Sequence, residues 1–77
     1  MQEDCMSRFR ERLRLVRKGN KLTQDELAEK IGVSKNAVWI WEHGRRNMSA
    51  ESVIRIALLF EVSADWLLGL SNEKEVL

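Results

Sequence analysis

The 77-residue sequence contains no proline or tyrosine, a single cysteine (Cys5) and a single histidine (His43). A lone cysteine cannot form a disulfide within the chain, and one Cys with one His cannot supply the usual four ligands of a structural zinc site. No run of about eighteen apolar residues is present, and residues 1–5 show no apolar signal region. The sequence therefore offers no disulfide, zinc site or membrane span, and its free thiol suits the reducing cytoplasm, where we expect the protein.

Charged residues are distributed unevenly, although the net charge is only +1. Residues 8–46 contain eleven Lys and Arg against five Asp and Glu, whereas the remainder contains two against seven. One half of the chain is therefore basic and the other acidic, which is a weak indication of an anionic partner for one face. Taken alone, such a surface is more often simply solvated.

Apolar residues recur at steps of three and four, and no stretch alternates apolar and polar residues as a strand would. The expected fold class is all-α, a compact bundle of five helices in a domain of residues 1–69, followed by a polar tail over residues 70–77. The predicted helices are one from Met6 to about Gly19, then Gln24–Ile31, then Lys35–Glu42, then one after Ser49 and a short one after Ser63.

The second and third helices have the clearest boundary signals. Thr23 is a natural N-cap, and Glu26, three residues later, completes a capping box. Gly32 ends the second helix, because glycine readily adopts the left-handed backbone of a tight turn, and Ser34 is expected to cap the third. Two short helices joined by such a turn form a helix-turn-helix unit, which can insert its second helix into a DNA major groove.

Trp39 and Trp41 cannot both face the core, because residues two apart lie about 200° apart around a helix. Trp41 shares a side with Ala37 and Val38, so we expect Trp41 to be buried and Trp39 to be exposed. Lysine can donate to guanine, asparagine can pair with adenine, and isoleucine can contact a thymine methyl. The outward side therefore carries the candidate base contacts Lys35, Asn36, Trp39 and Ile40, with Ser34 at the helix start.

Three roles are open for Trp39. It could fold back over neighbouring side chains or serve a protein interface, where tryptophan is enriched. The role we favour is contact with sugar and thymine-methyl surface at the groove wall, with the indole N–H reaching a phosphate.

Five landmarks occur in order along the chain: Arg17, LTQDELAEKIGVSKNAV (22–38), WEHG (41–44), IA (56–57) and VSADWLLG (62–69). Together they resemble one known family, the phage repressor and Cro family, or xenobiotic-response-element type of helix-turn-helix. The resemblance covers roughly residues 9–69 and implies a lambda-repressor-like fold with 24–31 as positioning helix and 35–42 as recognition helix. It implies a sequence-specific regulator of transcription, with repression as the expected effect, that binds double-stranded operator DNA.

The resemblance also implies residue roles. Base contacts would come from Lys35, Asn36 and Ile40, and an ion pair would join Arg17 to Glu42. Many family members have small or polar residues where this chain has Trp39 and Ile40, so the operator sequence cannot be carried over. Gln24 would bind a DNA phosphate, and the other expected phosphate contacts are Thr23, His43, Arg45, Arg46 and Asn47.

A short recognition helix reads only a few base pairs, so we expect a homodimer on a palindromic operator. Leu58, Leu59 and Trp66 are the candidate interface residues, although surplus core residues would explain the two leucines equally well. The alternative is an antitoxin-type interaction module that neutralises a toxin through its acidic half and binds DNA for autoregulation.

An enzyme is not expected. The sequence has no Cys/His or Ser/His/Asp pairing with the spacing of a catalytic site, no glycine-rich phosphate loop and no metal-binding cluster. We accordingly expect no cofactor, no metal, no membrane partner and no small-molecule ligand.

Overall fold

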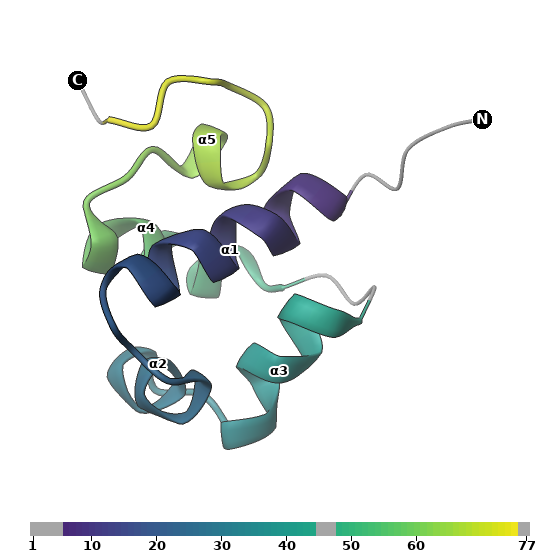
Figure 1. Ribbon diagram of the computed structural model, residues 1–77, viewed down its shortest axis with the longest axis vertical. Helices are drawn as coiled ribbons and strands as arrows, with labels where there is room; N and C mark the ends of the chain where they lie inside the picture. Colours follow the sequence, from purple (N-terminus) through teal and green to yellow (C-terminus); the bar gives the residue numbers. More distant parts are fainter. Residues whose placement is uncertain (1–5, 45–47, 76–77) are drawn as a thin grey trace.

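Five α-helices follow one another in residues 6–44 and 48–75, the parts of the chain that the structure, a computed structural model, describes (Figure 1). Apart from one isolated bridge between Val62 and Glu75, no strand pairing occurs in these residues. The predicted all-α bundle is confirmed, and its third helix is one residue longer than expected. The helix bounds are α1 Ser7–Gly19, α2 Gln24–Ile31, α3 Lys35–His43, α4 Ala50–Phe60 and α5 Ala64–Leu67.

Helix α1 crosses the middle of the molecule, with α5 on one side and α2 and α3 on the other (Figure 1). Its inward residues recur at steps of three and four and therefore share one face. Burial of a large apolar side chain contributes about 1.5–3 kcal/mol, so the core that these helices share stabilises their arrangement. The core consists of Phe9, Leu13, Val16, Leu27, Ala28, Ile31, Val38, Trp41, Ile56, Val62, Trp66 and Leu67.

The start of α2 has the capping box that the sequence predicts. Thr23 Oγ1 accepts a hydrogen bond from the Glu26 N–H at 3.0 Å, and the Thr23 N–H donates to Glu26 Oε1 at 2.9 Å. At the other end, Gly32 has a φ of 74°, in the left-handed region that favours glycine. These two local signals determine where α2 begins and ends and how the chain turns into α3.

Ser34 differs from expectation. It stands at the N-cap position of α3 with extended backbone angles, and its carbonyl accepts from the Ala37 N–H, but its side chain makes no capping hydrogen bond. The expectation of a side-chain cap was therefore wrong. Ser34 is exposed, in the turn between α2 and α3.

The segment after α5 turns back over the helices. The Ser63 N–H donates to the Lys74 carbonyl oxygen at 2.7 Å, and Val62 bridges Glu75. From α1, Arg12 Nη1 donates to the Ser71 carbonyl oxygen at 2.7 Å. The described part of the polar tail therefore packs against the bundle.

Trp66 lies beneath this returning segment. It is only 6% exposed, its carbonyl oxygen accepts from Arg12 Nη1, and its ring faces the Arg12 guanidinium at 4.9 Å and the Lys74 ammonium at 5.3 Å. The expectation that Trp66 belongs to a dimer interface is corrected, because the side chain is buried within its own chain. No helix among the described residues combines the length and apolarity that spanning a bilayer requires.

Candidate nucleic-acid interface

Helix α3 has two different faces. Trp41 is 8% exposed and Val38 is fully buried in the core, whereas Trp39 is 53% exposed. Lys35 and Asn36, on the outward side with Trp39, are exposed as well. The prediction that Trp41 is buried and that Trp39 points outward is confirmed, and its cause is the angle of about 200° between residues two apart in a helix.

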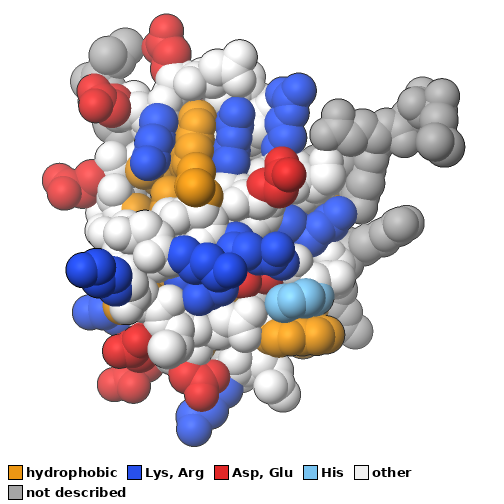
Figure 2. Space-filling model, in the orientation of Figure 1, with side chains coloured by type: hydrophobic (Ala, Val, Ile, Leu, Met, Phe, Trp, Pro, Cys, Tyr) orange, Lys and Arg blue, Asp and Glu red, His pale blue; other side chains and the backbone are white. Residues whose placement is uncertain are grey.

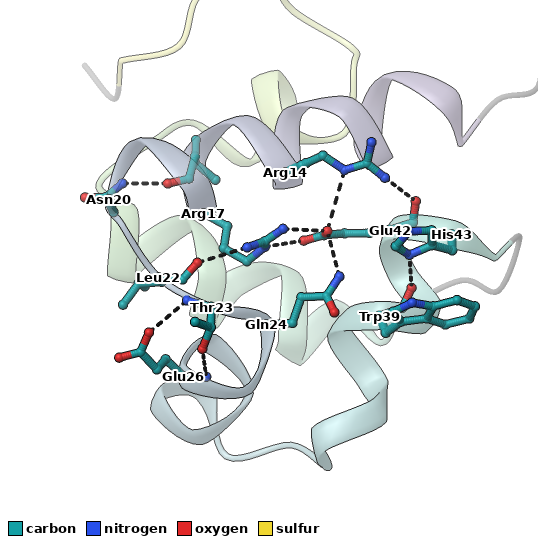
Figure 3. A network of polar contacts seen from close by, with 11 residues as sticks. Arg14, Arg17, Asn20, Leu22, Thr23, Gln24, Glu26, Trp39, Glu42 and His43 are labelled. Carbon is teal, nitrogen blue, oxygen red and sulfur yellow. Dashed lines mark hydrogen bonds and ion pairs between the residues drawn. The ribbon is translucent and has the colours of Figure 1, made fainter.

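Trp39 is not alone on this surface, because its ring stacks on that of His43 (Figure 3). The ring centroids are 4.4 Å apart and the planes are 13° from parallel. His43 Nδ1 lies 3.0 Å from the Trp39 carbonyl oxygen, and since a carbonyl oxygen only accepts, the Nδ1–H donates. Nε2 is left for another partner. The spacing of four residues is the signal that could have predicted this pair.

A buried polar network joins α1, α2 and α3 (Figure 3). Arg17 Nε donates to Glu42 Oε2 at 2.6 Å and Arg17 Nη2 to Oε1 at 2.9 Å. Gln24 Nε2 donates to Glu42 Oε1 at 3.1 Å, and Arg17 Nη1 donates to the Leu22 carbonyl oxygen at 2.9 Å. The Arg17 and Glu42 side chains are 9% and 0% exposed. They form the ion pair that the resemblance implies, and it locks the end of α3 to α1.

Glu42 remains a carboxylate in this network. Burial by itself raises the pKa of Glu42, but hydrogen bonds from Arg17 and Gln24, with the charges of Arg17 and Arg14, outweigh it. The pKa therefore lies below its ordinary value of 4.5. At neutral pH the carboxylate is ionised and balances the buried Arg17 guanidinium.

The amino terminus of α2 lies against the same network. One Gln24 amide N–H is used by Glu42, and an amide nitrogen has a second N–H to donate. Thr23 uses its hydroxyl oxygen as an acceptor in the capping box. The start of a helix attracts anions, so the position of these two residues is compatible with a bound phosphate. Their phosphate contacts remain predictions.

Two arginines of α1 reach the carboxyl end of α3, which the sequence did not lead us to expect. Arg14 Nη2 donates to the Glu42 carbonyl oxygen at 3.2 Å, and Arg10 Nη1 donates to the Gly44 carbonyl oxygen at 3.1 Å. Basic side chains are favourable beside the free carbonyls of a helix end. Lys and Arg side chains accordingly form a band beside the chain's only histidine, His43 (Figure 2). The spacing of four residues between the two arginines places them on one face of α1, and this spacing could have indicated the pair from the sequence.

The residues that build this face match a known family. The model described as "Helix-turn-helix domain" matches residues 11–73, which include α2, the turn at Gly32 and α3. The chain belongs to the xenobiotic-response-element type of helix-turn-helix family. The family consists of DNA-binding regulators of transcription and is not a class of enzymes.

Helix-turn-helix proteins similar to this chain include two curated relatives from Bacillus subtilis (strain 168). The uncharacterised HTH-type transcriptional regulator YqaE is 42% identical over 67 residues, which are 86% of this chain and 58% of the relative. The uncharacterised HTH-type transcriptional regulator YobD is 37% identical over 65 residues, 84% of this chain and 58% of the relative. The chain thus spans a little over half the length of these relatives.

A solved helix-turn-helix structure is also similar. The P22 c2 repressor, crystallised in complex with a synthetic operator, superposes with a TM-score of 0.75 at 30% identity, over 82% of this chain and 96% of that one. The match confirms the lambda-repressor-like fold.

The helix-turn-helix brings several of the expected contact residues to one surface. Ser34, Lys35 and Asn36 are exposed at the start of α3, and Ile40, the residue after Trp39, is half-buried. The remaining expected phosphate contacts, Arg45, Arg46 and Asn47, lie outside the described residues.

Proposed function

We propose that this protein is a sequence-specific transcriptional repressor that inserts α3 into the major groove of an operator as a homodimer. The observation that carries the proposal is the helix itself. Its outer face exposes Lys35, Asn36 and Trp39, while its inner face is fastened to α1 and α2 by the core and by the Arg17–Glu42 pair. A rigidly held helix with exposed donors suits the reading of base edges.

The base-reading residues in this proposal are Lys35, Asn36, Ile40, Trp39 and Ser34. Lys35 and Asn36 lie in the first turn of α3, the part of a recognition helix that enters the groove. Gln24, Thr23 and His43 flank this face and suit the backbone phosphates on either side. The P22 c2 repressor, a protein of this fold, was crystallised in complex with a synthetic operator, which supports DNA binding by this chain.

The regulator is favoured over the antitoxin-type module, because the relatives YqaE and YobD are named as transcriptional regulators. Selection of binding sites from random double-stranded DNA tests this function. We expect enrichment of a palindrome whose half-sites are separated by about one helical turn, roughly 34–36 Å, or a multiple of it. Recovery of no preferred sequence would contradict the proposal.

Asn36 and Arg45 are expected to affect binding in different ways. Asn36→Ala removes a bidentate partner of adenine, so it should relax preference at one base position by roughly 1–3 kcal/mol. Arg45→Ala removes a charge expected at the phosphates, so it should weaken binding to all sequences alike. Repeating the selection and the titrations with both variants measures the difference. Matching specificity profiles for the two variants would refute the assignment.

The proposed dimer surface lies on α4. Leu58 is 73% exposed, Ile54 54% and Leu59 40%. Leu58 and Ile54 border a mostly apolar hollow of about 520 Å³ whose floor includes Ala57 and Val62. Exposed apolar side chains around a hollow suit a self-complementary contact with a second copy. Ile54 was not identified from the sequence, although its spacing of four from Leu58 places the two residues on one face of the helix.

Leu58→Asp should shift the protein from dimer to monomer. Losing a buried leucine forfeits about 1.5–3 kcal/mol, so the dissociation constant of the dimer should rise about tenfold or more. Sedimentation equilibrium measures the change, and Leu15→Asp is the matched control, since Leu15 is 58% exposed on α1. An unchanged dimer in Leu58→Asp, or equal dissociation in both variants, would remove α4 from the interface.

A further inference from the structure

The hollow of the proposed dimer surface depends on the turn between α4 and α5. Glu61, Val62 and Ala64, which line it, belong to this turn and to the start of α5, whereas its other lining residues belong to α4. Glu61 has a φ of 55°, in the left-handed region that residues other than glycine occupy only at a cost. Such a turn keeps one shape only when its surroundings hold it.

The returning segment, residues 70–75, holds this turn from outside. In Figure 1 it passes over α5 and comes back towards the connection between α4 and α5. The Ser63 N–H donates to the Lys74 carbonyl oxygen at 2.7 Å, and Val62, which is 4% exposed, bridges Glu75. The residues that line the hollow at the turn are therefore fixed by backbone contacts with the returning segment.

The returning segment is fastened in turn to α1, through Arg12. Arg12 Nη1 donates to the carbonyl oxygens of Trp66 and Ser71, the second at 2.7 Å, and Nη2 donates to Asn72 Oδ1 at 3.3 Å. A guanidinium presents its donors in a rigid planar fork, so it can join two segments in one fixed geometry. Arg12 thus joins the end of α5 and the returning segment to α1.

Two neighbouring cations have weaker or different contacts. Arg8, one turn earlier on α1, makes an exposed hydrogen bond of 3.4 Å to the Gly69 carbonyl oxygen, just before the returning segment. Lys74 lies 5.3 Å from the Trp66 ring, but Lys74 belongs to the returning segment itself. The contacts of Arg12 are therefore the stronger link between α1 and this segment.

We propose that Arg12 is a positioning residue for the dimer, because it fastens the returning segment to α1 and so fixes the turn against which a second copy packs. This inference rests on the proposed homodimer and assigns to it a residue that does not line the hollow. It also makes residues 70–75 a working part of the folded domain.

Arg12→Gln tests the inference, because glutamine is shorter and has no fork of donors. Coupling between separate sites is typically worth about 5–150-fold, so the dissociation constant of the dimer should rise at least about fivefold in sedimentation equilibrium. Hydrogen exchange of the Ser63 amide, followed by NMR, should accelerate in the same variant, because the segment that carries its acceptor is released. An unchanged dimer, or a weakened dimer with wild-type exchange at Ser63, overturns the inference.

DNA binding separates positioning from a general loss of structure. Two labelled duplexes are titrated, the selected full operator and a duplex with one half-site, which a single protomer can occupy. Arg12→Gln should bind the full operator more weakly and the half-site as the wild type does. Equal weakening on both duplexes would show a merely structural role and overturn the inference. Failure of the proposed function is distinct, since the wild-type protein would then be monomeric or bind neither duplex.

Arg8→Gln is the matched control, because it makes the same substitution one turn away and removes only the longer bond to Gly69. An equal effect on the dimer in Arg8→Gln overturns the inference.

If Arg12→Gln proves unfolded by thermal melting, Ser63→Pro and Ser63→Ala decide. Both lose the hydroxyl that accepts from the Trp66 N–H, but only the proline variant also loses the N–H that donates to Lys74. The Ser63 φ of −67° suits proline. The dimer should dissociate more readily in Ser63→Pro than in Ser63→Ala, and equal dissociation constants overturn the inference.

Discussion

Glu42→Ala is expected to lower the free energy of unfolding by about 3–5 kcal/mol, the usual effect of removing one partner from a buried ion pair. The loss of stability is large because the buried charge of Arg17 remains when its counterion, the Glu42 carboxylate, is removed. The guanidinium, 9% exposed in the intact protein, would keep only the Leu22 carbonyl oxygen as a hydrogen-bond partner among the described residues, and Gln24 would lose its acceptor. Urea denaturation at neutral pH measures the change.

Glu29→Ala is the matched control for this variant. Glu29 is an exposed glutamate of α2, and loss of such a surface side chain changes stability by about 0.5 kcal/mol or less. Equal, small losses for the two variants would show that the Arg17–Glu42 pair does not stabilise the fold.

The same pair makes stability depend on acid pH. The pKa of Glu42 is lowered in the folded protein, so its contribution is complete above its ordinary pKa of 4.5 and is lost as the pH falls through the lower folded value. Glu42→Gln should remove this part of the acid dependence while preserving side-chain volume. A pH series of melting curves for the wild type and Glu42→Gln would reveal it, and parallel acid profiles would contradict it.

Features that depend on neighbouring residues along the chain could be predicted. The capping box of Thr23 and Glu26, the turn at Gly32 and the opposite directions of Trp39 and Trp41 all follow from local spacing. The order of the helices could also be predicted from local spacing. Each of these features involves backbone or side chains within a few residues, which the sequence displays directly.

Features that depend on tertiary packing could not be predicted from the sequence pattern. Trp66 lies in a four-residue helix, too short for a periodic pattern to indicate a buried face, and it is covered by Arg12 from α1 and Lys74 from the returning tail. The reach of Arg14 to Glu42 depends on how α1 crosses α3. Serine is a favourable N-cap residue, but residue type does not determine the side-chain rotamer, and the Ser34 hydroxyl makes no capping hydrogen bond.

The two tryptophans of α3 should respond to truncation in opposite ways. Trp41→Ala opens a cavity in the core and is expected to cost about 3–5 kcal/mol of folding free energy. Trp39→Ala removes only the stack on His43, a contact worth about 0.5–1.5 kcal/mol for an aromatic pair. Thermal melting of both variants at one protein concentration measures the contrast.

Trp39 should contribute little to stability but should contribute to operator binding. The His43 ring lies 4.4 Å from the indole and keeps a half-exposed apolar surface in one orientation on the outer face of α3. A surface oriented before binding suits sugar and thymine-methyl groups at the groove wall, because little freedom is lost on contact. Trp39→Ala should therefore weaken operator binding while the domain stays folded, and His43→Ala should weaken it less, since the indole remains. Wild-type affinity in Trp39→Ala, or an unfolded domain, would exclude this role and favour a packing or protein-interface role for the residue.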